Sequence, residues 1–156
     1  MANEQQKYLN RTRLWGLTTL GMALGIWEMV EESATSLSPM IGKQVLEMAE
    51  KQLGLEVAGE KPEDVLTELA RIFIDEFGYA VDSKVERADK TISISFKNAV
   101  GTSEFNLLKQ AGAEKLFCHP YMCAGLAVLS RMGIKARWDV TIDVATGSQT
   151  VTYELL

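Results

Sequence analysis

The residues best suited to chemistry lie together in one short segment. Cys118, His119 and Cys123 fall within six positions, and they are both cysteines and the single histidine of the chain. On a helix, His119 and Cys123 are four residues apart and share a face, and Cys118 could fold back from just before the helix. Thiolate and imidazole groups suit zinc, copper or iron. The segment is therefore a candidate site for zinc, another transition metal or haem.

Other interpretations of this segment stay open. A structural zinc ion takes four protein ligands and a catalytic zinc ion takes three plus water, whereas this segment offers at most three. The two thiols could instead be half-buried structural cysteines beside a histidine that caps the helix or faces solvent. One thiol could be redox-active or acylatable, because a helix N-terminus lowers a thiol pKa. A Cys/His nucleophile pair would also need an orienting third group and an oxyanion hole.

The remaining composition excludes several classes of protein. The sequence contains no nucleophile elbow, P-loop, dinucleotide-binding or zinc-protease motif. With 16 Lys and Arg against 21 Asp and Glu, the formal net charge is −5. The affinity of proteins for nucleic acids comes mostly from Lys and Arg on phosphates. We therefore expect no nucleic-acid partner. Two free thiols also make no disulfide scaffold, which favours a cytoplasmic protein.

Large apolar side chains at core-phase positions offer a second kind of site. Aromatic rings and Met side chains adapt to irregular apolar ligands, although the same spacing also builds an ordinary core. The candidates for the wall of an apolar pocket are Trp27, Phe73, Phe77, Cys118, Tyr121, Met122 and Trp138. We expect this pocket between the first three helices and a sheet, near Cys118 and Trp138.

The uncharged segment 14–27 looks like a signal peptide or a membrane helix. Fourteen helical residues span about 21 Å, which is short of the ~30 Å hydrocarbon core of a bilayer. No small-residue cleavage site follows it, and Glu28 continues the helix directly. We therefore predict a largely buried helix of a soluble protein, without stable membrane insertion. Gly21 and Gly25 would let a second helix approach closely, as a core or dimer contact.

The hydrophobic periods predict the elements that must position these residues. A period of three to four predicts helices over 3–34, 38–53, 62–77 and 119–132, and a short helix follows the turn and N-cap at 101–103 and runs to about Gln110. Strict alternation predicts one β-hairpin over 79–97 and another over 134–155. We expect a single α+β domain over 1–156, in which 1–34 is a long N-terminal helix that belongs to the core or to a dimer contact. Its N-terminal helices should pack on one face of a four-stranded antiparallel sheet made of the two hairpins.

Several short motifs occur in the order of a known family. Along the chain they are Glu31-Glu32, Gly42, Leu53-Gly54, Phe77-Gly78-Tyr79, the strand 92–98, Cys118-His119, Ala124-Gly125-Leu126 and Gly133. Through them, residues 14–156 resemble the 4-vinyl reductase-type (hydrocarbon-binding) small-molecule-binding domain, whose fold is shared with TRAPP vesicle-tethering subunits. The family tends to carry cysteines near the closing hairpin, and 144–156 contains none.

The resemblance implies an apolar ligand cavity between helices and sheet, often a homodimer, and binding more than catalysis. We therefore expect a non-catalytic protein that binds a hydrocarbon or lipid-like molecule. One alternative is a metal- or haem-binding sensor that uses Cys118, His119 and Cys123. Another is a hydrolase of a small ring compound, by likeness to thiazoline-carboxylate hydrolases, and its turnover would depend on His119.

Overall fold

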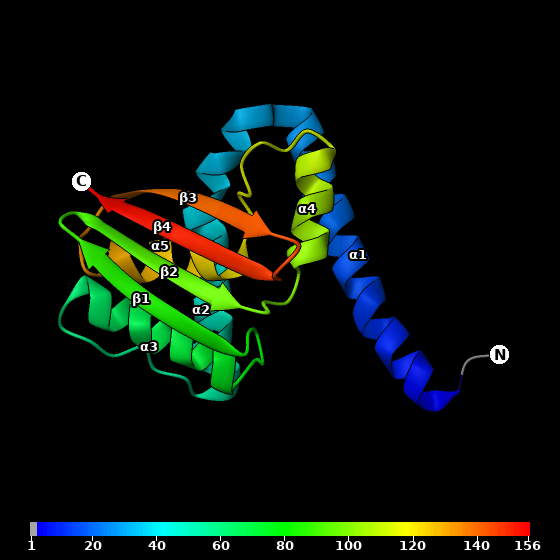
Figure 1. Ribbon diagram of the computed structural model, residues 1–156, viewed down its shortest axis with the longest axis horizontal. Helices are drawn as coiled ribbons and strands as arrows, with labels where there is room; N and C mark the ends of the chain where they lie inside the picture. The colour runs from blue at the N-terminus through cyan, green and yellow to red at the C-terminus, as the bar shows by residue number, and fades with distance from the viewer. Residues whose placement is uncertain (1–2) are drawn as a thin grey trace.

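The computed structural model describes residues 3–156, except for the side chain of Thr12. Its elements are α1 (Glu4–Val30), the 3-10 helix η1 (Glu31–Leu37), α2 (Ser38–Leu53), α3 (Pro62–Asp75), β1 (Asp82–Ala88), β2 (Thr91–Lys97), α4 (Thr102–Gln110), α5 (Pro120–Arg131), β3 (Ala136–Asp143) and β4 (Ser148–Leu155). Helices α2, α3 and α5 lie on one face of the sheet (Figure 1). The predicted α+β class is confirmed.

The sheet is made of the two predicted hairpins, joined through their second strands. Its order is β1-β2-β4-β3, and every neighbouring pair is antiparallel. Because side chains alternate between the two faces of a strand, Ile94 and its partner Val151 both face the helices. The other face carries hydroxyl groups, such as those of Ser95 and Thr150, which lie 3.1 Å apart. This face stays in contact with water.

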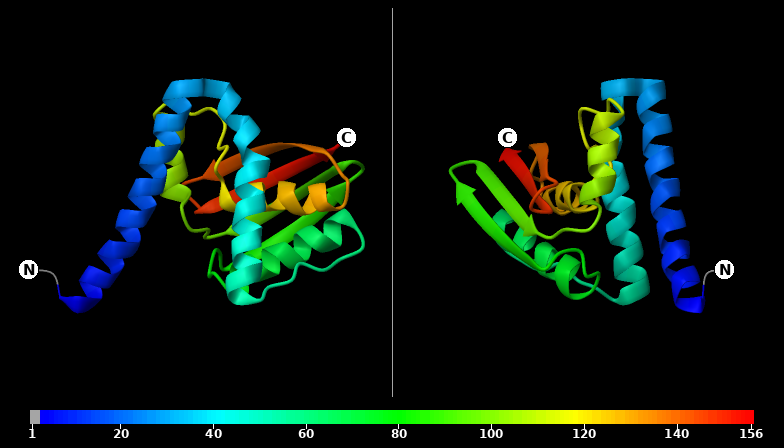
Figure 2. Two further views of the ribbon diagram at one scale, coloured as in Figure 1. Left: turned by 180° about the vertical axis from the view of Figure 1, so that it is seen from behind. Right: turned by 45° about the vertical axis from the view of Figure 1, so that its right-hand side comes forward.

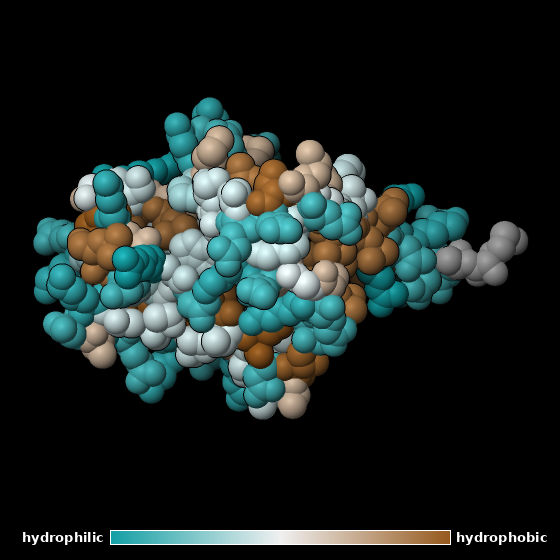
Figure 3. Space-filling model, turned by 90° about the horizontal axis from the view of Figure 1, so that it is seen from above, coloured by the Kyte–Doolittle hydropathy of each residue, from teal (hydrophilic) through white to brown (hydrophobic). Residues whose placement is uncertain are grey.

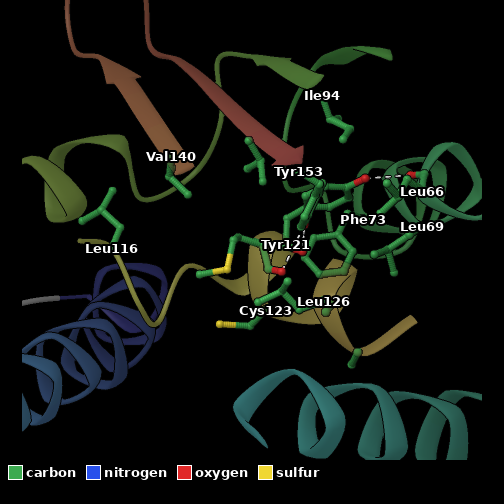
Figure 4. Close-up of a cluster of buried hydrophobic side chains, with 14 of the residues drawn as sticks. Leu66, Leu69, Phe73, Ile94, Leu116, Tyr121, Cys123, Leu126, Val140 and Tyr153 are labelled. Carbon is green, nitrogen blue, oxygen red and sulfur yellow. Dashed lines mark hydrogen bonds between the residues drawn. The ribbon is translucent and has the colours of Figure 1, made fainter. Parts of the chain in front are cut away.

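Helix α5 is the centre of the core. Every residue from 121 to 129 is buried, because α2 and α3 cover one side of the helix and the sheet covers the other. A cluster of rings and aliphatic chains surrounds it (Figure 4), with Phe73 and Tyr121 in an edge-to-face contact at 5.3 Å. Helix α5 can approach β4 so closely because Gly125 has no side chain, and a Cβ there would lie 2.0 Å from the Tyr153 hydroxyl.

Helix α1 differs most from its prediction. The apolar segment 14–27 was expected to be largely buried, and this is wrong: Trp15 is 74% exposed and Met22 is 64% exposed. Only the side of α1 that carries Ala23 and Trp27 packs on the rest of the chain. The helix leads away from the body of the molecule (Figures 1 and 2). No helix among the described residues is long and apolar enough to cross a membrane.

Several boundaries also differ from the predicted ones. Helix α1 ends at Val30 rather than near residue 34, and Glu31 adopts φ 48° and ψ −130° as the chain turns into η1. Helix α3 ends at Asp75, two residues before the predicted end. Strand β1 begins at Asp82, so Tyr79 lies before the strand, where its ring packs into the core.

Candidate functional site

His119 begins α5 as its N-cap residue. Its Nδ1 accepts a hydrogen bond from the backbone N–H of Met122 at 3.1 Å. Pro120 takes the first helical position, where no N–H is needed. Since Nδ1 is an acceptor, the ring is neutral and its proton is on Nε2. This nitrogen donates to Oε1 of Gln149 at 2.8 Å, and the Tyr79 hydroxyl donates to the same oxygen at 2.5 Å.

The amide of Gln149 extends these contacts to α4. Its Nε2 donates to the hydroxyl of Thr102 at 2.8 Å and to the carbonyl of Val100 at 3.1 Å. We call Tyr79, Thr102, His119 and Gln149 the His119 network. It joins the start of α5, the start of α4, the first part of β4 and the segment before β1. Gln149 was not among the predicted site residues, although it is a polar residue in phase with the apolar Val151 and Tyr153.

The His119 network is buried and uncharged. Burial lowers the pKa of His119 to about 4 and raises the pKa of Tyr79 well above its usual value. The imidazole has no exposed surface, and both of its nitrogens are occupied. It has no path to a substrate in this structure, so the arrangement does not favour a hydrolase that depends on His119. The network instead fixes four segments of the chain relative to one another.

The two cysteines are free thiols in different environments. Cys123 is buried, and its Sγ donates to the carbonyl of Phe117 at 3.1 Å, an oxygen that also accepts from the hydroxyl of Ser38. Cys118 is half-buried. Burial raises the pKa of Cys118 to about 11, and it raises the pKa of Cys123 further. Both thiols are therefore protonated at neutral pH, whereas a thiolate is needed for attack or for metal binding.

The candidate metal ligands have other partners in this structure. Across residues 3–156, no group of three or more His, Cys, Asp or Glu side chains is arranged to hold a metal ion. A metal at Cys118, His119 and Cys123 would have to break the N-cap of α5 or the bond from His119 to Gln149. The three residues are close in sequence, but the fold does not turn them toward a common point. Zinc or another transition metal at this segment stays a prediction.

The seven candidate pocket residues do not line one cavity. Tyr121 and Met122 have no exposed surface and belong to the core. Trp27 stacks on Phe117, with ring centroids 6.3 Å apart, and thereby attaches α1. Trp138 is half-buried on the helix-facing side of β3. Cys118 is half-buried and lies two residues before Pro120, the first residue of α5. Only Phe73 and Phe77 line a common opening.

That opening is a small apolar hollow at the seam between α2 and α3. Its volume is about 20 Å³, which is room for roughly one water molecule. Its lining residues come from α2, the loop after it and the end of α3: Val45, Leu46, Ala49, Glu50, Leu55, Val57, Leu69, Ile72, Phe73 and Phe77. We call it the α2–α3 hollow. Of these ten residues, only Phe73 and Phe77 were predicted to line a pocket. Leu55 and Val57 could have been found, because apolar residues in a loop indicate such a contact.

The rim of the hollow carries one charged group, and it is paired. The carboxylate of Glu50 accepts hydrogen bonds from the guanidinium of Arg131 in α5, one of them at 3.0 Å. This bond lowers the pKa of Glu50. All other lining side chains are aliphatic or aromatic. Because its one charge is already neutralised by Arg131, the hollow suits a hydrocarbon better than an anion.

A second opening has the opposite character. A groove of about 310 Å³ lies over the ends of β1 and β2 and the turn between β3 and β4. It is lined by Asp82, Ser83, Lys84, Ser95, Phe96, Lys97, Thr146 and Ser148. Seven of these eight side chains are polar or charged, and the one apolar side chain, that of Phe96, is buried.

Comparison with solved structures identifies a fold of known type. The chain is similar to the crystal structure of a trafficking protein particle complex subunit 3 from Naegleria fowleri covalently bound to palmitic acid. The TM-score is 0.57 and the identity 13%, over 94% of this chain and 95% of that one. This chain shares the fold of TRAPP subunits. At this identity the likeness shows the fold alone.

The sequence itself matches no family model and no curated protein. The structural match confirms the part of the predicted resemblance that concerns the fold shared with TRAPP subunits. Membership of the 4-vinyl reductase-type family stays a prediction, because no family model supports it.

Proposed function

We propose that this protein is a non-catalytic binder of one hydrocarbon chain, such as a fatty acyl group, at the α2–α3 hollow. The observation that carries the proposal is the hollow itself, which opens the apolar core between two helices. The TRAPP-fold neighbour, which holds palmitic acid, supports the class of ligand. The cytoplasmic location and the homodimer expected from the sequence stay predictions.

Binding requires the hollow to widen, because about 20 Å³ does not hold an acyl chain. The parts of its wall best able to move lie outside the helices. Phe77 follows the end of α3 and is 48% exposed, and Leu55 and Val57 belong to the loop between α2 and α3. Each methylene that enters the core contributes about 0.8 kcal/mol. Several methylenes would therefore offset the cost of displacing Phe77 and this loop.

The proposal needs no thioester. In the neighbour the palmitic acid is covalently bound, but neither cysteine of this chain lines the hollow. The raised pKa of Cys118 also disfavours its attack on an acyl donor. We therefore expect an acyl chain that is released by organic extraction, without hydroxylamine.

A fluorescent polyene fatty acid, cis-parinaric acid, tests the proposal. Ala49 lines the hollow. Met48, the residue before it in α2, does not line the hollow and is 51% exposed. Ala49→Trp fills the hollow, and Met48→Trp places the same ring outside it. We expect the wild type and Met48→Trp to bind the probe with similar affinity.

For Ala49→Trp we expect affinity at least tenfold lower, with an unchanged circular dichroism spectrum. Native mass spectrometry of the purified chain should show the mass of a retained fatty acid. No binding by the wild type would overturn the proposal, and equal binding by all three proteins would move the site away from the hollow.

A further inference from the structure

The lining of the α2–α3 hollow offers one polar side chain to the headgroup of a ligand. Nine of the ten lining side chains are apolar, and the tenth is that of Glu50. Exposed apolar side chains elsewhere do not locate a headgroup, because hydrophobic and hydrophilic side chains are interspersed on the face seen from above (Figure 3). A charged group left against apolar walls costs free energy. The headgroup of a chain whose tail occupies the hollow should therefore emerge beside Glu50.

Arg131 of α5 lies directly beyond Glu50 at this rim. Its Nη1 and Nη2 donate to the two carboxylate oxygens of Glu50, the second at 3.0 Å. A guanidinium has five N–H groups, so this pair leaves three of them. Within residues 3–156, the Nε of Arg131 forms no hydrogen bond. The Arg131 side chain is 44% exposed, so a ligand can reach the open side of the guanidinium.

Arg71 of α3 shows a guanidinium with both sides occupied. Its Nε and Nη2 donate to Glu68 at 2.9 and 2.7 Å, and its Nη1 donates to Asp75 at 3.0 Å. One arginine of this chain therefore holds two carboxylates at once. Arg131 holds only the carboxylate of Glu50, and the side of its guanidinium that carries Nε is open. A second carboxylate fits this side, because the planar fork of N–H groups matches two oxygens.

We propose that Arg131 binds the carboxylate of a free fatty acid whose tail occupies the α2–α3 hollow. This inference rests on the proposed function and adds the class of headgroup, which is a carboxylate rather than a neutral ester or alcohol. The carboxylate stays outside the hollow, in contact with water, and only the hydrocarbon enters. Glu50 keeps its own bonds and thereby holds the guanidinium at the rim.

Other charges around Arg131 limit the strength of this contact. The hydrogen bonds to Glu50 and the negative charges of Glu50 and Glu47 raise the pKa of Arg131, and the same charges would repel a second carboxylate. Lys43 offsets part of this repulsion, since its Nζ lies 3.9 Å from Glu47. An exposed ion pair changes affinity by at most about fivefold. We therefore expect Arg131 to favour a fatty acid over its neutral ester by about three- to fivefold.

Two probes with the same chain, cis-parinaric acid and its methyl ester, test this inference by fluorescence titration. The measured quantity is the ratio of the affinity for the acid to the affinity for the ester. In Arg131→Gln this ratio should fall by about three- to fivefold, while the affinity for the ester stays at the wild-type value. Arg71→Gln is the matched control, since Arg71 is also paired with carboxylates but its partners do not line the hollow. Its ratio should equal that of the wild type.

Glu50→Gln is a second variant that keeps the arginine. Gln has nearly the shape of Glu, so the hollow should keep its lining, and the loss of one negative charge should strengthen the binding of the acid. The ratio should therefore rise several-fold, with unchanged affinity for the ester. A ratio that stays at the wild-type value in both Arg131→Gln and Glu50→Gln would overturn the inference.

The same titrations separate this inference from the proposed function. Ala49→Trp fills the hollow and should weaken the binding of both probes, whereas Arg131→Gln should weaken only that of the acid. If both probes bind at the hollow and the ratio ignores Arg131, the headgroup assignment is wrong and the hydrocarbon binder stands. If neither probe binds the wild type, both proposals are overturned.

Discussion

Gly42 of α2 lies against the main chain of Cys123 in α5. A Cβ built on Gly42 would lie 1.8 Å from the carbonyl oxygen of Cys123, which is less than any real contact between these atoms. The two helices can cross at this distance only because Gly42 has no side chain. The obstacle is backbone rather than the end of a flexible side chain, so it cannot be moved without separating α2 from α5.

Gly42→Ala should therefore destabilise the protein. Forcing one methyl group into a packed core typically costs 1–3 kcal/mol, and here the contact is with backbone, so we expect a loss of about 3 kcal/mol. Urea denaturation followed by circular dichroism measures the free energy of unfolding. The matched control is Gly16→Ala on α1, where a Cβ would meet nothing within 4 Å. A loss for Gly42→Ala no larger than that for the control would contradict the observed crossing.

The His119 network makes stability depend on pH. The pKa of His119 is about 4 in the folded protein against an ordinary 6.5, because the ring is buried. As the pH falls below 6.5, the unfolded chain therefore takes up a proton that the folded protein excludes. Stability should be complete above pH 6.5 and decline between pH 6.5 and pH 4. The difference of about 2.5 pKa units corresponds to roughly 3 kcal/mol.

His119→Asn isolates this contribution from that of the carboxylates, which also titrate in acid. Asparagine is a good N-cap, so α5 should still begin at the same residue. The free energy of unfolding of both proteins is measured by urea denaturation at several values of pH. The variant should be less stable at neutral pH, and the gap between the two proteins should narrow toward pH 4. Parallel pH curves would refute the buried neutral imidazole.

The sheet could be predicted from the sequence because its signal is local. Alternation puts Ile92, Ile94 and Phe96 on one side of a strand whatever surrounds it, and the structure has them buried. The hydrogen-bond partners of a buried polar side chain could not be predicted in this way, because they are distant in the sequence. His119 bonds to residues 30 and 40 positions away, Gln149 and Tyr79. No spacing within 118–123 indicates these contacts, so the same residues could be interpreted as metal ligands.

The prediction for α1 failed for a related reason. The lack of charge from Leu14 to Trp27 shows that this helix has apolar faces, but not which of them the same chain covers. The chain covers the side of the helix that carries Trp27 and leaves Trp15 and Met22 exposed. In the same way, Phe73 and Phe77 were expected in a pocket and do line the α2–α3 hollow, whereas its size depends on packing that periodicity does not report.

The two thiols should differ in reactivity toward iodoacetamide. Cys118 is half-buried with a pKa raised to about 11, so its alkylation should be slow at neutral pH and should accelerate about tenfold per pH unit up to that value. Cys123 is buried and bonded to the Phe117 carbonyl, so it should react only when the protein unfolds. Mass spectrometry of tryptic peptides from time courses at several pH values measures both rates.

Cys118→Ser provides the control, since it should abolish the alkylation of the folded protein. The same time courses test the metal-site prediction, because a metal bound by both thiols would protect both of them until a chelator is added. Protection that is lifted by a chelator, together with one zinc per chain by elemental analysis, would show a metal site that this structure does not contain. Fast labelling of Cys118 at neutral pH would contradict its raised pKa and would reopen its role as an acylatable thiol.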